Sequence, residues 1–449
     1  MSAGSIEPRA IDLTGNAAPA ATSGKVASAI REALTRPLAS YYIVLASSAL
    51  LAALGLLMVT SASSVWSAYD TGDPYSYARS HVFYLAIGVG LAFVLSRCNE
   101  TLLWLAGMAG YVLAGVLLAM VVFTPFGMEY YGNRSWLDLP LVPQFQPSEL
   151  AKVALVLWCA SFISSRERSL GDLGKWLPQV VLFSGALFVL VAAEKDYGSA
   201  LVFAGIIVAL LWFTGLPAKY MAVLSGAGVA AAVALVLLVP SKMGRVVDWL
   251  AGFVPGVQSV GVVSDQPLNA IYALASGGWW GRGLGASVQK WGGLKNGAQT
   301  DYVFAVIGEE LGLFGTLIVM VLFFALIWAG LRIAGRSDRV FFRILAAGIS
   351  GWLGIQAMIN IFVALRLLPV VGITLPFISY GGSSLISCML AVGLLLAAAR
   401  NEPEARRVLG KVSKKTPTRV VGIVSAPAPA QAATGARDTM HLVPGSAKR

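Results

Sequence analysis

Charged residues are scarce in this chain, and their scarcity limits the class of protein. Of the 449 residues, 12% are Asp, Glu, Lys or Arg, and 57% are hydrophobic. Soluble globular domains carry about 25% charged residues, and the mean hydropathy here is +0.74. The composition therefore excludes a series of soluble domains and predicts a protein with many membrane-spanning segments.

Histidine and cysteine are also rare. The chain has 2 histidines and 3 cysteines, the latter at Cys98, Cys159 and Cys388. Their positions match neither a disulfide framework nor the spacing of metal ligands, so we predict no metal site built from these residues. No internal repeat is visible, which disfavours transporters built from inverted repeats.

Long apolar runs are abundant. A helix needs about 20 apolar residues to cross ~30 Å of hydrocarbon. Ten such runs occur near 42–63, 80–97, 101–123, 149–165, 177–193, 199–214, 219–240, 308–333, 343–366 and 383–399. They predict an all-α polytopic membrane protein with about ten transmembrane helices and one long loop, 241–302, between spans seven and eight.

The distribution of lysine and arginine predicts the orientation, because cytoplasmic loops carry an excess of these residues. If the N-terminus is cytoplasmic, the inner short loops hold Arg97, Arg166, Arg168, Lys175, Lys219, Arg332, Arg336, Arg339 and Arg343, whereas the outer ones hold Arg79, Arg134, Lys195 and Arg366. Both termini are then cytoplasmic and the long loop is extracytoplasmic. This bias and the basic tails account for the net charge of +11, so no nucleic-acid partner is predicted.

Three segments follow from these patterns. Residues 1–40 and 401–449 are rich in Ala, Ser, Gly, Pro and basic residues, which predicts disordered cytoplasmic tails. Residues 41–400 form the predicted membrane domain. Its first span comes too late and is too long for a cleavable signal peptide.

The long loop contains three acids, Asp248, Asp265 and Asp301. Asp301 lies directly before a new apolar run, where a helix would hold it at the membrane surface. A carboxylate there can accept a proton from a substrate that lies partly in lipid. The alternative is a helix cap or a partner for the helix dipole. Glu309 and Glu310, at the start of the next helix, are expected to anchor its outer end.

Two outer segments before and at the fourth span carry further polar residues. Gly-Asn-Arg-Ser-Trp occupies 132–136, and Gln-Pro-Ser-Glu-Leu-Ala-Lys occupies 146–152. Glu149 and Lys152 share a helix face at i and i+3. They form either a local ion pair or, together with Arg134, a cationic pocket for an anionic head group.

Two more segments interrupt the apolar pattern. Glu-Lys-Asp at 194–196 predicts either a solvated hairpin or a turn within a cavity, with Asp196 as the candidate residue. Residues 368–384 contain two prolines and two adjacent glycines outside the last span. Such backbone is tolerated at membrane depth where it lines protein or water. We expect a re-entrant segment in which Ser379, Gly381, Gly382 and Ser383 border the cavity and the glycines let a substrate approach.

Taken together, these motifs resemble the SEDS family of bacterial cell-wall polymerases. The most specific pieces are 375–384, 132–136, 146–152 and Thr-Asp at 300–301 followed by Ile-Gly-Glu-Glu-Leu-Gly at 307–312. The resemblance runs from about 45 to 399 and is closer to the division type than to the elongation type. The chain departs from the usual pattern at Gln299, where a His is common, at 194–195, at 295–297, and at Arg366, where a small residue is usual.

The resemblance implies an inverting glycosyltransferase that polymerises lipid II into glycan strands in septal cell-wall synthesis. Asp301 matches the essential extracytoplasmic aspartate of the family, and Arg134, Glu149, Lys152 and Asp196 match polar positions around its central cavity. No tightly bound cofactor is implied, although a divalent cation, Mg²⁺ or Mn²⁺, can accompany the substrate pyrophosphate.

The resemblance also implies a setting and partners. It places the chain in the bacterial cytoplasmic (inner) membrane at the division septum, beside a class B penicillin-binding protein (FtsI-like) and other division proteins. Three alternatives stay open: a lipid II flippase, a non-catalytic scaffold of the division complex, and the elongation-type paralogue. A flippase needs a polar path to the inner leaflet, whereas the polar motifs here gather in the predicted outer half.

Overall fold

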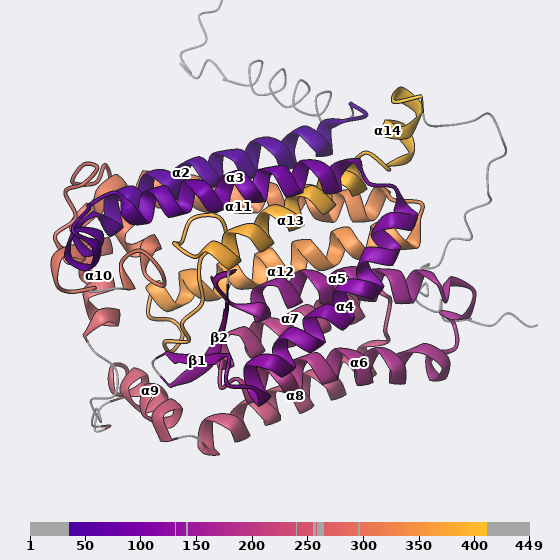
Figure 1. Ribbon diagram of the computed structural model, residues 1–449, viewed down its shortest axis with the longest axis horizontal. Coiled ribbons are helices and arrows are strands. Elements are labelled where there is room, and N and C mark those ends of the chain that lie inside the picture. Colours follow the sequence, from indigo (N-terminus) through magenta and orange to yellow (C-terminus); the bar gives the residue numbers. More distant parts are fainter. Residues whose placement is uncertain are drawn as a thin grey trace, which may run out of the picture. The chain divides into compact units, whose positions relative to one another are not determined.

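The computed structural model describes residues 36–130, 132–140, 142–238, 240–254, 257, 265–294 and 297–410. The predicted tails therefore lie outside the described residues over 1–35 and 411–449. Figure 1 shows the arrangement of the helices and strands in the described part.

Each of the ten predicted spans corresponds to a helix. The helices are α2 (Ala39–Thr71), α3 (Ser76–Arg97), α4 (Glu100–Phe123), α5 (Pro147–Ser164), α6 (Leu173–Ala193), α7 (Tyr197–Phe213), α8 (Ala218–Leu238), α11 (Val303–Arg336), α12 (Val340–Ala364) and α13 (Gly382–Ala399). In the described part of the chain, 8 helices are long and apolar enough to cross a membrane, and α7 is a shorter apolar helix. The predicted all-α polytopic membrane fold is confirmed.

Local signals in the sequence explain several helix ends. The side chain of Asn99 caps α4 by accepting a hydrogen bond from the backbone N–H of Leu102 at 2.8 Å, as favoured N-cap residues do. Pro147 lies in the first turn of α5, where its missing N–H costs nothing. Gly72 ends α2 in the left-handed conformation, with φ of 74°.

The helices differ in how much they bury. In the most apolar stretches of α5, α12 and α13, 83%, 72% and 78% of residues are buried, against 22% for α3 and α4. The former three therefore form the centre, where a helix is apolar on all sides because protein surrounds it. In Figure 1, α2 and α3 form one edge and α6 and α8 the opposite edge. Their exposed apolar side chains face the lipid.

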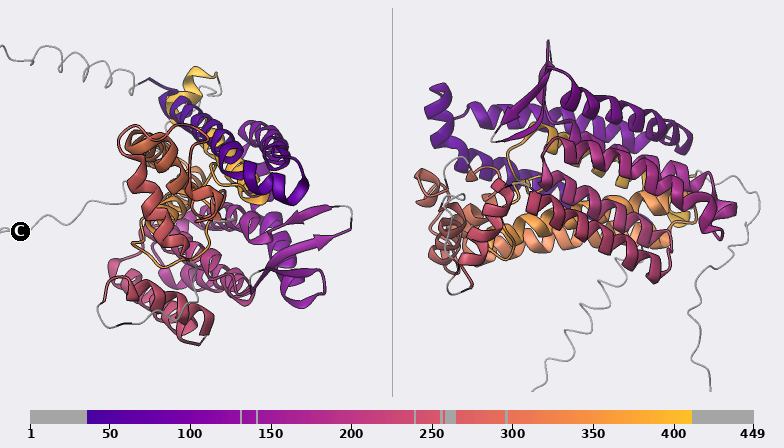
Figure 2. Two further views of the ribbon diagram at one scale, coloured as in Figure 1. Left: turned by 90° about the vertical axis from the view of Figure 1, so that its left-hand side faces the viewer. Right: turned by 90° about the horizontal axis from the view of Figure 1, so that it is seen from below.

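A small antiparallel sheet between α4 and α5 was not predicted from the sequence. Its strands are β1 (Gly127–Tyr130), β2 (Asn133–Leu139) and β3 (Val142–Phe145), in the order β1-β2-β3. Ser135 and Leu137 are buried on alternate positions of β2, as the two-residue period of a strand requires. Figure 2 shows the strands extending away from the helices.

The predicted loop 241–302 also contains helices. Helix α9 (Pro240–Ala251) and helix α10 (Gln266–Gly277) lie within it, and a 3-10 turn, η2, spans Gln289–Trp291. Glu309 and Glu310 of α11 hold the end of this loop. Glu309 accepts hydrogen bonds from the Ser287 hydroxyl at 2.6 Å and the Val288 N–H at 3.0 Å. Their predicted anchoring role is confirmed.

Glu310 extends this anchor to α2. Its carboxylate accepts a hydrogen bond from Ser61 at 2.7 Å and forms an ion pair with Lys290 at 2.9 Å. Both partners of the ion pair are almost fully buried, at 2% and 0% side-chain exposure. A buried charge is tolerated when it is paired and hydrogen-bonded, so this cluster fixes the long loop against the bundle.

The structure also changes one boundary. Residues 401–410, assigned above to the disordered C-terminal tail, contain the short helix α14 (Pro403–Val408). Arg336 pairs with Glu402 at 3.6 Å and with Glu404, and Arg406 pairs with Asp338. These contacts hold α14 against the turn between α11 and α12. The ordered part of the chain therefore extends at least ten residues beyond the predicted boundary at 400.

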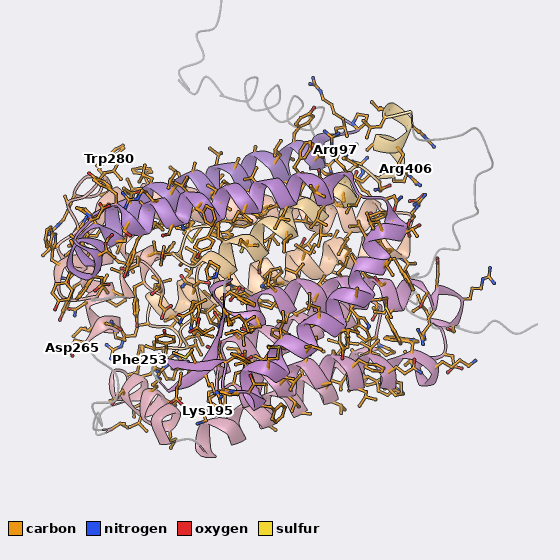
Figure 3. All side chains as sticks on the ribbon, viewed as in Figure 1. Arg97, Lys195, Phe253, Asp265, Trp280 and Arg406 are labelled. Carbon is orange, nitrogen blue, oxygen red and sulfur yellow. The ribbon has the colours of Figure 1, made fainter. Side chains whose placement is uncertain are left out.

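The two ends of the bundle differ in the residues they carry. Figure 3 shows Arg97 and Arg406 at one end and Phe253, Asp265 and Trp280 at the opposite end. The long loop therefore lies at the opposite end of the bundle from Arg97 and Arg406.

Candidate functional site

The turn that carries Asp301 is held at three successive carbonyl groups. The backbone N–H of Tyr380 donates to the Gln299 carbonyl at 2.8 Å, and the Ser379 hydroxyl donates to the Thr300 carbonyl at 2.6 Å. The Nδ2 of Asn360 donates to the carbonyl of Asp301 at 3.0 Å. Because all three contacts involve backbone acceptors, they fix the position of Asp301 and leave its carboxylate available.

Asn360 joins this turn to the segment before α13. Its Nδ2 also donates to the carbonyl of Ile373 at 2.6 Å, and the residue is 1% exposed. Ser379, besides its bond to Thr300, accepts a hydrogen bond from the N–H of Leu375 at 2.8 Å. The proline- and glycine-containing segment is thus an ordered support for the Asp301 turn. Placing a polar residue inside a span costs free energy, so such residues mark functional sites. By this criterion Asn360 could also have been identified from the sequence.

The two adjacent glycines have different surroundings. A Cβ on Gly382 would lie 2.6 Å from the ring of Tyr84 in α3, whereas one on Gly381 would meet only ordinary contacts at 3.6 Å or more. Gly382 therefore allows close packing of α13 against α3. Ser383 accepts a hydrogen bond from the backbone N–H of Gln146 at 2.9 Å, which links the starts of α13 and α5.

The carboxylate of Asp301 lies beside Gly372. A Cβ built on Gly372 would be 3.7 Å from its Oδ2. Burial raises the pKa of Asp301 from 3.8 to about 6, the positive charge of Arg245 opposes the rise, and the negative charge of Asp196 adds to it. Burial disfavours the charged form of a carboxyl group. Asp301 therefore has a proton affinity matched to a base that works near neutral pH.

Asp196 lies in a buried turn, so the alternative of a solvated hairpin is wrong. It is 5% exposed, and its carboxylate caps α7 by accepting from the Ser199 N–H at 3.0 Å and the Ser199 hydroxyl at 2.8 Å. It also accepts from the Nε2 of Gln146 at 2.7 Å. The cap explains why α7 begins at Tyr197. Lys195, between the two acids, has a positive φ of 61° and is exposed.

Glu194 is fully buried at 0% exposure. Burial raises the pKa of Glu194 to about 9, and the nearby charge of Asp196 contributes to the rise. The group is therefore a neutral carboxylic acid at pH 7. Its backbone carbonyl accepts a hydrogen bond from the N–H of Arg134 at 2.9 Å, which joins strand β2 to the turn between α6 and α7.

The side chain of Arg134 contacts the protein backbone. It donates to the carbonyls of Gly127 at 3.2 Å and Thr124 at 2.6 Å. These bonds satisfy the C-terminal end of α4 and the start of β1, so the residue stabilises the sheet. Guanidinium groups near a helix C-terminus are also favoured by the helix dipole.

Glu149 and Lys152 form the local ion pair that the sequence left open. The two charged atoms are 2.8 Å apart, and the side chains are 8% and 1% exposed. The ammonium of Lys152 also donates to Oε1 of Gln356 at 2.9 Å and lies 5.5 Å from the ring of Trp352. Arg134 shares none of these partners, so the described contacts do not combine Arg134 and Lys152 into one cationic pocket.

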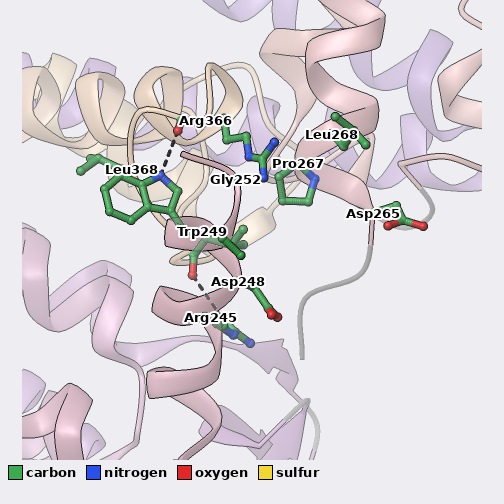
Figure 4. Close-up of a pocket in the computed structure, with 11 residues that line it drawn as sticks. Arg245, Asp248, Trp249, Gly252, Asp265, Pro267, Leu268, Arg366 and Leu368 are labelled. Carbon is green, nitrogen blue, oxygen red and sulfur yellow. Dashed lines mark hydrogen bonds between the residues drawn. The ribbon is translucent and has the colours of Figure 1, made fainter. Parts of the chain in front are cut away.

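A cavity of about 200 Å³ opens near this site and was not predicted from the sequence (Figure 4). It is lined by Arg245, Asp248, Trp249, Ala251, Gly252, Asp265, Pro267, Leu268, Arg366, Leu368 and Val370. Three segments that are distant in sequence form it: α9, the start of α10 and the turn after α12. The available signal was that 240–251 combines charged and apolar residues at helical spacing.

Side chains that could hold a metal ion are not grouped in the described ranges: no cluster there contains three or more His, Cys, Asp or Glu residues. The acids of the site are instead hydrogen-bonded to protein groups, as for Asp196, or partly exposed, as for Asp301.

The fold and this site define a polytopic membrane protein with a buried polar centre at the loop end of its bundle. A family profile described as "Cell cycle protein", covering the FtsW, RodA and SpoVE proteins, matches residues 41–404. The chain belongs to this family, as its motifs predicted.

Curated relatives agree with this assignment. The chain is 38% identical over 362 residues to the probable peptidoglycan glycosyltransferase FtsW of Coxiella burnetii, a match that covers 80% of this chain and 95% of that protein. It is 37% identical over 374 residues to the protein of the same name from Mycobacterium tuberculosis, covering 83% and 70%. The stage V sporulation protein E of Bacillus subtilis is 33% identical over 351 residues, covering 78% and 94%.

Solved structures share the fold. One is a chain of a peptidoglycan synthase complex that coordinates polymerization and crosslinking, with a TM-score of 0.63, 28% identity, and coverage of 80% of this chain and 97% of that one. The rod shape determining protein RodA of Thermus thermophilus gives a TM-score of 0.57 at 28% identity, covering 80% and 96%.

Proposed function

We propose that this chain is a peptidoglycan glycosyltransferase that polymerises lipid II into glycan strands during septal cell-wall synthesis. The names of its FtsW relatives support the activity and the division role. The observation that carries the mechanism is the turn of Asp301, whose three carbonyl groups are held by Asn360, Ser379 and Tyr380.

The reaction transfers a glycan from a lipid-linked diphosphate, the donor, to a sugar of a second lipid-linked molecule, the acceptor. The 4-hydroxyl of the acceptor attacks the anomeric carbon of the donor, the new C–O bond forms, and the bond from that carbon to the diphosphate breaks. The bonding electrons leave with the diphosphate, and the hydroxyl proton passes to Asp301. Attack from the face opposite to the leaving group inverts the configuration.

One carboxylate is sufficient for this chemistry. Diphosphate leaves without being protonated, so the site does not need the second carboxyl group that glycoside hydrolases use as an acid. Asp301 acts as the general base. Asp196 and Gln146 hold the start of α7 near the beginning of α5, and Glu194 precedes Asp196 in the same turn. These residues position the walls of the site around the acceptor.

The setting of the enzyme is part of the proposal. We place it in the bacterial cytoplasmic membrane with both termini in the cytoplasm, at the division septum, beside a class B penicillin-binding protein that cross-links the new strands. A divalent cation, Mg²⁺ or Mn²⁺, can enter the site bound to the diphosphate of the substrate.

Synthesis of glycan from labelled lipid II tests the proposal directly. The purified full-length chain, mixed with its penicillin-binding partner, is expected to produce long polymer, and the partner alone none. Absence of polymer from a correctly assembled pair would contradict the enzyme and favour lipid transport or scaffolding. A flippase would then move labelled lipid II across vesicles without polymerising it, whereas a scaffold would do neither.

The rate of polymerisation is expected to depend on pH through Asp301. A general base must be deprotonated, and the pKa of this group is raised to about 6. The rate should therefore fall about tenfold for each pH unit below 6 and level off above 7. An ordinary aspartate, with a pKa near 3.9, would keep full activity down to pH ~5. The measurement is initial rate between pH 4.5 and 8, and a flat profile over this range would contradict the assignment.

A further inference from the structure

The cavity of Figure 4 contains two arginines that come from different segments. Arg245 belongs to α9, and Arg366 lies in the turn that follows α12. The volume is about 200 Å³, below the ~300–1,000 Å³ of pockets that enclose a drug-sized ligand. The cavity therefore suits one charged group of a larger molecule better than a whole disaccharide.

The guanidinium of Arg245 uses few of its hydrogen-bond donors within the described residues. Within the described ranges it makes one long hydrogen bond, from Nη1 to the carbonyl of Val370 at 3.5 Å. An arginine offers five N–H donors in a planar fork. The same positive charge acts on the carboxylate of Asp301, so Arg245 lies within electrostatic range of the proposed base.

Arg366 is held in an uncommon backbone conformation. Its φ is +58°, and its carbonyl accepts a hydrogen bond from the indole N–H of Trp249 at 2.9 Å. Residues kept in such conformations cluster at functional sites. The guanidinium lies over the ring of Phe253 at 5.7 Å. A Cβ on Gly252 would lie 2.0 Å from Nη2, so the glycine makes room for this arginine.

The other charges of the cavity are acidic. Asp248 and Asp265 also line it. In Figure 4 Asp265 lies apart from both guanidinium groups, whereas the carboxylate of Asp248 lies close to the guanidinium of Arg245. Asp265 is exposed to solvent. Because Arg366 and Arg245 lie toward opposite ends of the cavity and Asp248 lies beside Arg245, an anion is expected on the side of Arg366, with Arg245 contributing from the other end.

The two cations first considered for binding an anion have other partners. Arg134 donates to backbone carbonyls, and Lys152 is paired with Glu149 at 1% exposure. Using Lys152 for a substrate would leave Glu149 as a buried unpaired charge, which is costly. Arg245 and Arg366, by contrast, line the cavity itself.

We propose that the cavity formed by α9, the start of α10 and the turn after α12 is an anion subsite, where Arg245 and Arg366 bind the diphosphate of the lipid-linked donor. This inference rests on the proposed function. When the bond from the anomeric carbon to the diphosphate breaks, the diphosphate gains the bonding electrons and the two guanidinium groups stabilise its charge. The proton of the acceptor goes to Asp301 on the adjacent turn.

Binding can be measured without turnover in the Asp301→Asn background. The probes are farnesyl diphosphate and farnesyl monophosphate, titrated calorimetrically against the full chain in nanodiscs of phosphatidylcholine. Arg245→Ala and Arg366→Ala should each weaken binding of the diphosphate about tenfold or more, as loss of a charge-assisted hydrogen bond predicts. The monophosphate should lose less. Lysine at either position should restore part of the affinity, because it keeps the charge and loses the fork.

Arg79→Ala is the matched control. It also removes one outer positive charge, from a side chain that is 70% exposed, and should leave the affinity unchanged. Unchanged affinity in the Arg245 and Arg366 variants, with normal melting temperatures, would overturn the subsite. Loss of farnesyl diphosphate binding when phosphatidylglycerol replaces part of the phosphatidylcholine would also overturn it, because the cavity would then take any lipid phosphate. Glycan synthesis by wild type is measured separately, so failure of the subsite and failure of the enzyme are distinguished.

Discussion

Replacement of Asp301 by asparagine is expected to lower the rate of glycan synthesis by about 10²–10⁴-fold, the usual contribution of a general base. The amide has the size of the carboxylate and cannot take a proton from the acceptor hydroxyl. The fold should survive, because Asn360 and Ser379 bind the carbonyl groups of residues 301 and 300. The measurement is polymerisation of labelled lipid II by the variant with its partner.

Asp138→Asn is a suitable control for this experiment. Asp138 is an exposed acid on strand β2, and its replacement removes one carboxylate from the same end of the protein. Its activity should equal that of wild type. Glycan synthesis at the wild-type rate by Asp301→Asn, with an unchanged melting temperature, would keep the enzyme and assign the base to another acid, of which Asp196 is the nearest candidate.

The helices of the fold could be predicted because membrane spans are long and uniformly apolar. All ten runs correspond to helices, including the short pair at 177–214, which became α6 and α7. The sheet could not be predicted in the same way. Its strands have four, seven and four residues, so alternation extends over too few positions to stand out. Helices α9 and α10, with 12 residues each, are likewise too short to be recognised as spans.

Asp301 could be identified from its position in the sequence, since an acid directly before an apolar helix is fixed at the membrane surface. Its supports could be identified only in part. Ser379 was named as a cavity residue, whereas its contact is the carbonyl of Thr300, 79 positions earlier in the chain. The contact of Gly382 with Tyr84 in α3 was not predicted. Pairings across such separations depend on how helices pack, which composition and spacing do not encode.

The cavity with Arg245 and Arg366 depends most strongly on how the helices pack. Three segments must come together before it exists, and none of them has a distinctive motif. Arg366 could be noticed because it stands where a small residue is usual in the family. Its relation to Trp249, through a hydrogen bond of 2.9 Å, became visible only in three dimensions.

Replacement of Lys152 by methionine is expected to destabilise the protein by about 3–5 kcal/mol in free energy of unfolding, the cost of removing one partner of a buried ion pair. Glu149 would keep its charge at 8% side-chain exposure, and the amide oxygen of Gln356 would lose a donor. The measurement is thermal unfolding of the purified chain in detergent, with Lys152→Arg as the variant that keeps the charge.

The double variant Glu149→Gln/Lys152→Met separates a structural ion pair from a substrate-binding cation. Replacing both charges of a buried pair by neutral groups of similar size is often neutral for stability. The double variant should therefore regain most of the melting temperature that Lys152→Met loses. If the pair serves the fold, glycan synthesis returns together with stability. A double variant that is stable and still inactive would show instead that Lys152 acts on the substrate, as the cationic-pocket alternative requires.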